Sequence, residues 1–125
     1  MGTQEKIQED TDEQAAVFSA LADPTRLKLV KLLCHQHDPH SLCVNALAAL
    51  LGVTQSAVSQ HLRVLRAIGL VKSERRGYHI HYSINQDVLE KCRRLTSAAL
   101  SMAEPSEGQS CLPYCPEGKR VKHAR

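Results

Sequence analysis

Residues 42–71 read LCVNALAALLGVTQSAVSQHLRVLRAIGLV, two short apolar patterns separated by a glycine. In the first pattern Val44 and Leu47 share a helical face, and Ser41 is the expected N-cap. Gly52 suits the left-handed residue that ends many helices. The stretch therefore begins with a predicted short helix that stops at the glycine.

The second pattern predicts another helix, which starts after Thr54, a good N-cap, and stops at Gly69. Within it Val58, Leu62 and Leu65 recur at the spacing of a buried helical face. Two short helices joined by a glycine-containing turn are typical of a helix-turn-helix.

The outward face of this second helix carries small or hydrogen-bonding side chains, where a solvent-facing helix usually carries Glu and Lys. Such side chains can reach base edges and phosphates in a major groove. The candidate DNA contacts on this face are Gln55, Ser56, Ser59, Gln60 and Arg63.

The next segment, LVKSERRGYHIHYSI at 70–84, predicts a hairpin with a basic tip. Arg75 and Arg76 before the turn and His79 after it are further candidate DNA contacts. One face of the second strand is expected to pack inward and the other to face out, since Tyr78, Ile80, Tyr82 and Ile84 alternate with His79, His81 and Ser83. A helix-turn-helix followed by such a hairpin is the winged-helix arrangement.

Helices are also predicted on both sides of this unit, at 13–23, at 23–34 after the N-cap Asp23 with Pro24 in the first turn, and at 85–102. The fold class is therefore mainly α with a small β-hairpin wing. The apolar stripe of the last helix consists of Val88, Cys92, Leu95 and Ala99. If the first helix does not cover this stripe, a second chain must, so a homodimer through the first and last helices is expected.

The whole chain has 125 residues, 42% hydrophobic and 23% charged, which is typical of one small globular domain. We expect an acidic flexible N-terminus (1–13), a DNA-binding and dimerisation domain (14–102) and a flexible basic tail with cysteines (103–125). No apolar run is long enough for a membrane span, and the N-terminus lacks the apolar core of a signal peptide. A cytoplasmic protein is expected.

The net charge of +3 is unevenly distributed. Residues 1–13 carry five acids and one Lys, whereas residues 54–82 carry five basic residues and one acid. The basic middle suits a polyanionic partner, although a solvated surface gives the same count.

Taken together, these motifs resemble the ArsR/SmtB family of dimeric winged-helix repressors, over roughly residues 14–100. The resemblance is carried by ALADPTRLKLVKLL at 20–33, by the helix-turn-helix at 42–71 and by YHIHYSI at 78–84. It implies a transcriptional repressor, not an enzyme, that binds a palindromic operator as a dimer. An inducer then releases the DNA, usually a metal or metalloid ion and sometimes a reactive sulfur or redox signal.

The expected DNA contacts divide into two kinds. The recognition-helix residues before Arg63 are expected at base edges, while Arg63 and the two wing arginines are expected mostly at phosphates. His61 belongs to the family pattern, but its place beside Leu62 favours packing or helix positioning over base contact.

The sensing site departs from the best-known patterns of the resembled family. Arsenic- and cadmium-type members begin this helix with Cys-Val-Cys, whereas here only Cys43 is present, and the stretch from Gln86 that matches the zinc and nickel site of other members has no His. In the tail, Cys111 and Cys115 could fold back onto Cys43 of the same or the partner subunit. Three thiolates would select As(III), Sb(III), Cd(II) or Pb(II), with Zn(II) the weaker candidate.

The same thiols have two other interpretations, a redox or persulfide sensor and exposed tail thiols without a function. Cys34 ends an apolar stripe and is expected in the core, and Cys92 is expected at the dimer core. Solvation is favoured over binding of Zn(II) or Cu(II) for the histidines of the tract CHQHDPHSLC, which are His35, His37 and His40.

Two rival classes of function differ from an operator-binding repressor. A zinc-dependent enzyme is disfavoured because the chain has no His-Glu-x-x-His and no ligand pair on one helix beside a carboxylate base. A winged-helix module for protein or RNA stays open, because the fold alone does not distinguish it.

Overall fold

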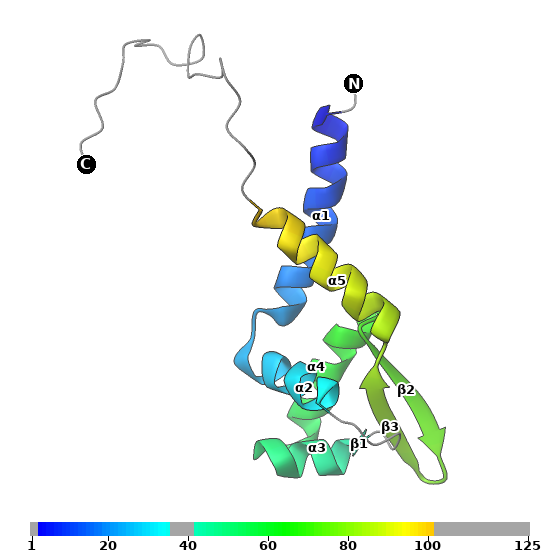
Figure 1. Cartoon of the computed structure of the whole chain (residues 1–125). Helices are drawn as coiled ribbons and strands as arrows, with labels where there is room; N and C mark the ends of the chain where they lie inside the picture. Colours follow the sequence, from blue (N-terminus) through cyan, green and yellow to red (C-terminus); the bar gives the residue numbers. More distant parts are fainter. Residues whose placement is uncertain (1–2, 36–41, 102–125) are drawn as a thin grey trace, which may run out of the picture.

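The computed structural model describes residues 3–35 and 42–101. Five helices and a three-stranded antiparallel sheet of order β1-β3-β2 make up this part of the chain (Figure 1). In chain order the elements are α1 (Thr3–Leu21), α2 (Pro24–Cys34), β1 (Leu42–Cys43), α3 (Val44–Leu51), α4 (Gln55–Ala67), β2 (Val71–Arg76), β3 (His79–Ile84) and α5 (Gln86–Ala99). The expectation of a mainly helical fold with a small wing is confirmed.

The elements divide between two ends of the molecule. Figure 1 shows α1 and α5 crossing at one end, with the amino end of α1 pointing away from the rest, and α3 and the β2–β3 hairpin at the other end. The helix-turn-helix of α3 and α4 and the hairpin therefore share one end of the fold.

Local signals set the helix boundaries. Asp23 caps α2 by accepting hydrogen bonds from two backbone N–H groups, and the Thr54 hydroxyl caps α4 by accepting one from Ala57 N at 3.1 Å. Gly52 ends α3 with a φ of 69°, in the left-handed region. The expected Ser41 cap is replaced by Cys43, because the chain is extended through β1 until α3 begins; Ser41 itself lies outside the described residues.

The apolar faces predicted for the helix-turn-helix form the centre of the core. Leu47, Val58 and Leu65 are fully buried, and Leu62 is 1% exposed. Leu29 of α2 is also fully buried. Burial of one such side chain stabilises the fold by about 1.5–3 kcal/mol, so this cluster fixes how α2, α3 and α4 pack.

The wing packs inward only at its base. Tyr82 and Ile84 are buried as predicted, but Ile80 is 42% exposed and Tyr78 is 96% exposed. The prediction that one whole face of this strand packs inward is wrong, because the hairpin extends past the helices and its tip has nothing to pack against.

Two elements differ from expectation in length or existence. The first helix begins at Thr3, ten residues before its predicted start at residue 13, and so extends through most of the acidic segment 1–13. The two-residue strand β1 was not predicted; it pairs antiparallel with β3, placing Leu42 opposite Tyr82 and Cys43 opposite His81.

The last helix packs on the first within one chain. Cys92 is buried, and Val88 and Leu95 are half-buried, so α1 covers most of the stripe that was expected to need a partner. The Cys92 thiol lies in the chain's own core, and its placement at a dimer core stays a prediction. Phe18 (39% exposed) and Leu100 (75% exposed) are large apolar side chains that remain uncovered at the α1–α5 end.

Candidate nucleic-acid interface

The recognition helix α4 has two faces of different chemistry. Its buried face holds Val58, Leu62 and Leu65 against the core. All five predicted contacts on the opposite face are exposed, namely Gln55, Ser56, Ser59, Gln60 and Arg63. Because the inner face is fixed by packing, the outer face presents amide, hydroxyl and guanidinium groups in a fixed pattern, as reading of base edges requires.

The wing adds cations beside this helix. Arg75 and Arg76 are consecutive residues of β2, so their side chains leave opposite faces of the hairpin. Arg76 Nη2 lies 3.2 Å from Glu74 Oε1, an exposed ion pair that is weak in water and leaves the guanidinium able to meet a phosphate. His79, paired with Arg76 across the ladder, is exposed as well.

His61 does not face the predicted reading surface. Its Nδ1 lies 3.1 Å from Arg26 Nη1, and its Nε2 lies 3.8 Å from Asp23 Oδ1. Arg26 Nε also donates to the Ala20 carbonyl oxygen at 2.6 Å. These contacts fit the expected positioning role of His61. The contact of Arg26 with His61 was not predicted, although the motif Asp-Pro-Thr-Arg that contains Arg26 stands out in the sequence.

The Asp23 carboxylate is held in its charged form. A hydrogen bond from the backbone N–H of Arg26 is the largest cause that lowers the pKa of Asp23; burial opposes it, and the Thr25 N–H and the positive charge of Arg26 lower the pKa further. The two N–H···Oδ1 distances are 3.0 Å and 2.8 Å. The start of α2 and one side of α4 therefore meet at one anionic oxygen.

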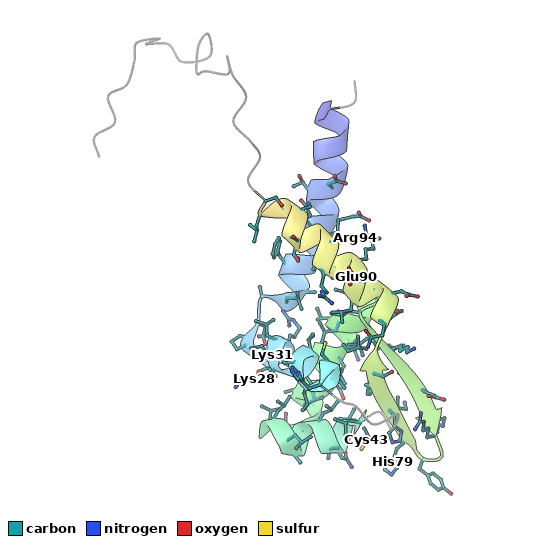
Figure 2. The ribbon with its side chains drawn as sticks, viewed as in Figure 1. Lys28, Lys31, Cys43, His79, Glu90 and Arg94 are labelled. Carbon is teal, nitrogen blue, oxygen red and sulfur yellow. The ribbon has the colours of Figure 1, made fainter. Side chains whose placement is uncertain are left out.

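Cys43 lies next to the predicted DNA contacts. It is the N-cap of α3, and its side chain makes no capping hydrogen bond. A hollow of about 290 Å³ is lined by Cys43 and Asn45 of α3's start, by Ser59 of α4 and by His79 of the wing, among others. Figure 2 shows Cys43 and His79 at the same end of the molecule. A ligand on this thiol would therefore sit beside the reading helix and the wing.

Across the sheet from Cys43 lies an imidazole with one buried nitrogen that has no hydrogen-bond partner. His81 pairs with Cys43 through the β1–β3 ladder, and its Nδ1 is buried and unpartnered. Among the described residues, however, no three His, Cys, Asp or Glu side chains come together as a group that could hold a metal ion. Any ion on Cys43 would need ligands from outside the described residues.

The other two described thiols, those of Cys34 and Cys92, are poor candidates for a metal or redox site. Cys34 is exposed, which contradicts its expected place in the core: it is the last residue of α2, one position past the buried Leu33. Partial burial nevertheless raises the pKa of Cys34 and of Cys92, offset in part by the charges of Arg93 and Lys91. A raised pKa disfavours the thiolate that metals and oxidants require.

Other predicted ligands are solvated or undescribed. His35 is exposed, with Nδ1 2.7 Å from the Lys31 carbonyl oxygen. Cys111, Cys115, His37 and His40 lie outside the described residues, so the three-thiolate set stays a prediction. Within residues 3–35 and 42–101, no helix combines the length and the apolar character needed to cross a membrane.

Comparison with known proteins gives concordant matches. A model of the arsR family of bacterial regulatory proteins matches residues 23–73. A transcriptional repressor SmtB homologue from Synechocystis sp. is 46% identical over 61% of this chain and 54% of its own length. A probable mercury resistance operon repressor from Streptomyces lividans is 34% identical over 70% of this chain and 72% of its own length.

The chain spans 54% of the length of the SmtB homologue and 65% of the length of a nodulation protein NolR from Rhizobium meliloti, to which it is 40% identical. The SmtB homologue and the mercury resistance protein are both described as repressors, in agreement with the expectation of a non-enzymatic regulator.

Solved structures agree with the fold. A possible transcriptional regulator for arsenical resistance superposes with a TM-score of 0.61 and 35% identity, covering 69% of this chain and 85% of that one. The homodimeric winged helix-turn-helix DNA-binding domain of Mb0332 from Mycobacterium bovis superposes with a TM-score of 0.59 and 29% identity, covering 79% and 90%. With motif order, fold and relatives in agreement, the chain belongs to the ArsR family of bacterial regulatory proteins.

Proposed function

We propose that this protein is a transcriptional repressor that binds a palindromic operator as a homodimer and leaves it when a soft metal or metalloid ion binds cysteine thiolates. The ion is As(III), Sb(III), Cd(II) or Pb(II), and the thiolates are those of Cys43, Cys111 and Cys115. The observation that carries the DNA part is the two-faced helix α4, whose core face is fixed and whose polar face is free.

The polar face of α4 and the wing supply different parts of the binding energy. Gln55 and Gln60 carry amides that can make paired hydrogen bonds to a base edge, and each such contact is worth about 1–3 kcal/mol of discrimination. Arg75 and Arg76 at the wing tip are exposed cations that meet phosphate and add affinity without selectivity.

The thiolate part of the proposal rests on the place of Cys43. Its side chain is free of capping contacts and lines the hollow that also contains Ser59 and His79. An ion held there by further thiolates would displace groups of the reading surface. The ion then binds the DNA-free protein more tightly than the DNA-bound protein. Such a difference in affinity is what allows one ligand to release another.

A thiol-based redox or persulfide sensor is the alternative of the same fold. The raised pKa values of Cys34 and Cys92 disfavour these two thiols as reactive groups. The alternative therefore uses Cys43 with the tail thiols, and a disulfide would take the place of the ion.

The DNA part is tested by fluorescence anisotropy with the duplex upstream of the protein's own gene and with a scrambled duplex. Gln60→Ala should change the preference between sequences, whereas Arg75→Ala should weaken both duplexes alike and reduce the slope of log affinity against log salt by about one. Equal binding of wild-type protein to both duplexes at every salt concentration would show that it is not a sequence-selective repressor.

The ion part is tested on the same complex, reduced and anaerobic, by titration with As(III) and separately with Cd(II). We expect release by at least one ion, and we expect Cys43→Ser and Cys111→Ser to abolish release while leaving DNA binding intact. Cys34→Ser is the matched control, since that thiol is exposed but outside the proposed set. Selective DNA binding that neither ion disturbs, but that an oxidant or persulfide relieves, would support the redox alternative.

A further inference from the structure

One side chain of α2 connects two helices that are far apart in sequence. Arg26 Nε donates to the Ala20 carbonyl oxygen at 2.6 Å, and Arg26 Nη1 lies 3.1 Å from His61 Nδ1, 35 positions along the chain. Ala20 is in the last turn of α1, where carbonyl groups lack an intrahelical donor. The guanidinium thus joins the end of α1 to the middle of the recognition helix.

The proton positions on His61 follow from this geometry. An arginine can only donate hydrogen bonds, so Nδ1 must accept and the proton of the neutral ring must lie on Nε2. That Nε2–H faces the Asp23 carboxylate at 3.8 Å. The ring is therefore placed between a donor and an acceptor, and a bond from a charged donor is stronger than a neutral one.

We propose that Arg26 and His61 are positioning residues for DNA reading. The bond between them holds α4 at the rotation about its own axis that presents Gln60 to a base edge. His61 directly follows Gln60 in the helix, and its side chain is partly buried, so the bond acts at the border between the core face and the reading face. This inference rests on the proposed DNA-binding function.

Core packing fixes which face of α4 points inward, and the bond between Arg26 and His61 adds a directional restraint to that packing. The apolar contacts of Val58, Leu62 and Leu65 are themselves non-directional. A hydrogen bond between a planar guanidinium and a planar ring is directional and weakens steeply with angle. Arg26 also donates a hydrogen bond to the end of α1. A shift of α1 would therefore move the Arg26 guanidinium and, through it, α4.

The test compares three replacements of His61. In His61→Asn the side-chain oxygen is the same number of bonds from the backbone as Nδ1, so the acceptor for Arg26 is kept. His61→Gln moves the acceptor to the reach of Nε2, beside Asp23, and His61→Leu has no acceptor. Asn and His have similar intrinsic helix propensities, so helix formation does not separate them.

We expect His61→Leu and His61→Gln to bind the operator about tenfold more weakly, the scale of one hydrogen bond to a charged group, and His61→Asn to stay within about threefold of wild type. Binding to a scrambled duplex should change by less than about twofold for all three, since it depends on phosphate contacts. Equal losses for Asn and Leu, or no loss for any of the three, would overturn the positioning role.

A second measurement needs no DNA, and its main readout uses the wild-type protein. Long-range ¹H–¹⁵N spectra of the free wild-type protein report which His61 nitrogen carries the proton; we expect Nε2, with a changed Nδ1 signal in Arg26→Leu. A proton on Nδ1 would disprove the bond itself. If wild-type protein lacks sequence-selective binding, the proposed function fails and the positioning role with it. Selective binding with the wrong variant order overturns only the positioning role.

Discussion

One carboxylate oxygen of Asp23 contacts two helices, α2 and α4. Its Oδ1 accepts from the backbone N–H groups of Thr25 and Arg26 and also faces the ring of His61. These interactions favour the charged carboxylate, which is why the pKa of Asp23 is lowered. Part of the stability of the α2 start therefore depends on this charge.

The sign of the resulting pH dependence can be derived. A carboxyl group whose pKa is lower in the folded state adds stability above its unfolded pKa and loses it as pH falls through the folded value. We predict that Asp23→Asn, which keeps the capping oxygen but not the charge, is less stable than wild type at neutral pH, and that this difference closes as wild type loses stability below about pH 4. Asp23→Ala should be less stable at both pH values.

Urea unfolding followed by circular dichroism at several pH values measures this difference. Since all other carboxyl groups are common to the three proteins, the gap between wild type and Asp23→Asn isolates one group. If the difference in the free energy of unfolding between these two proteins is the same at acid and neutral pH, the charge of Asp23 contributes nothing to the stability of the fold.

At the residue level, the sequence predicts those features that depend on residues close by in the chain. The caps Asp23 and Thr54 are confirmed because capping depends on the next three residues. The burial of Cys34 is wrongly predicted because it depends on what packs over the end of α2. The bond between Arg26 and His61 spans 35 positions and has no local signal.

Gly52 determines how the two helices of the helix-turn-helix meet. Its φ of 69° lets the chain reverse after α3, while the N–H groups of Gly52 and Val53 both donate to the Ala48 carbonyl oxygen, at 2.8 Å and 3.1 Å. No atom lies within 4 Å of where a Cβ would be, so any penalty for a side chain comes from the backbone alone.

We predict that Gly52→Ala lowers the free energy of unfolding by about 1–2 kcal/mol, the cost of a left-handed conformation for an ordinary residue. Gly52→Asn should cost less, because Asn tolerates this conformation better. Chemical unfolding of the three proteins checks both values. If Ala is as stable as Gly here, the turn must adopt a different conformation.

At the element level, helices and wing strands are predictable and β1 is not. The helices have caps and a 3.6-residue apolar period, and the wing strands have alternation around a glycine turn. A two-residue strand has no period. β1 exists because Leu42 and Cys43 lie opposite Tyr82 and His81, a pairing between segments far apart in the sequence.

For the whole molecule, two of the exposed large apolar side chains lie at the α1–α5 end. Phe18 and Leu100 are exposed there, although α1 already covers Cys92. The homodimeric domain of Mb0332 has the same fold. The proposed homodimer would bury Phe18 and Leu100 between these two helices and their copies, at the end opposite the wing tip (Figure 1).

We predict that Phe18→Asp weakens dimerisation by at least about tenfold, as expected for a charge placed in an apolar interface. Leu50→Asp is the matched control, since Leu50 is 61% exposed on α3, away from α1. Sedimentation over a range of protein concentrations checks both. Dimers of unchanged affinity in Phe18→Asp would place the interface elsewhere.

The two ends of the molecule also differ in charge, because the acidic segment 1–13 forms much of the amino-terminal half of α1 and the basic residues are concentrated in 54–82. The amino end of α1 and the wing tip point in opposite directions (Figure 1). A polyanion repels one end and attracts the other, so the protein is turned toward the duplex before any contact forms. Productive collisions become more frequent, and this gain in the association rate fades as added ions shorten the range of the field.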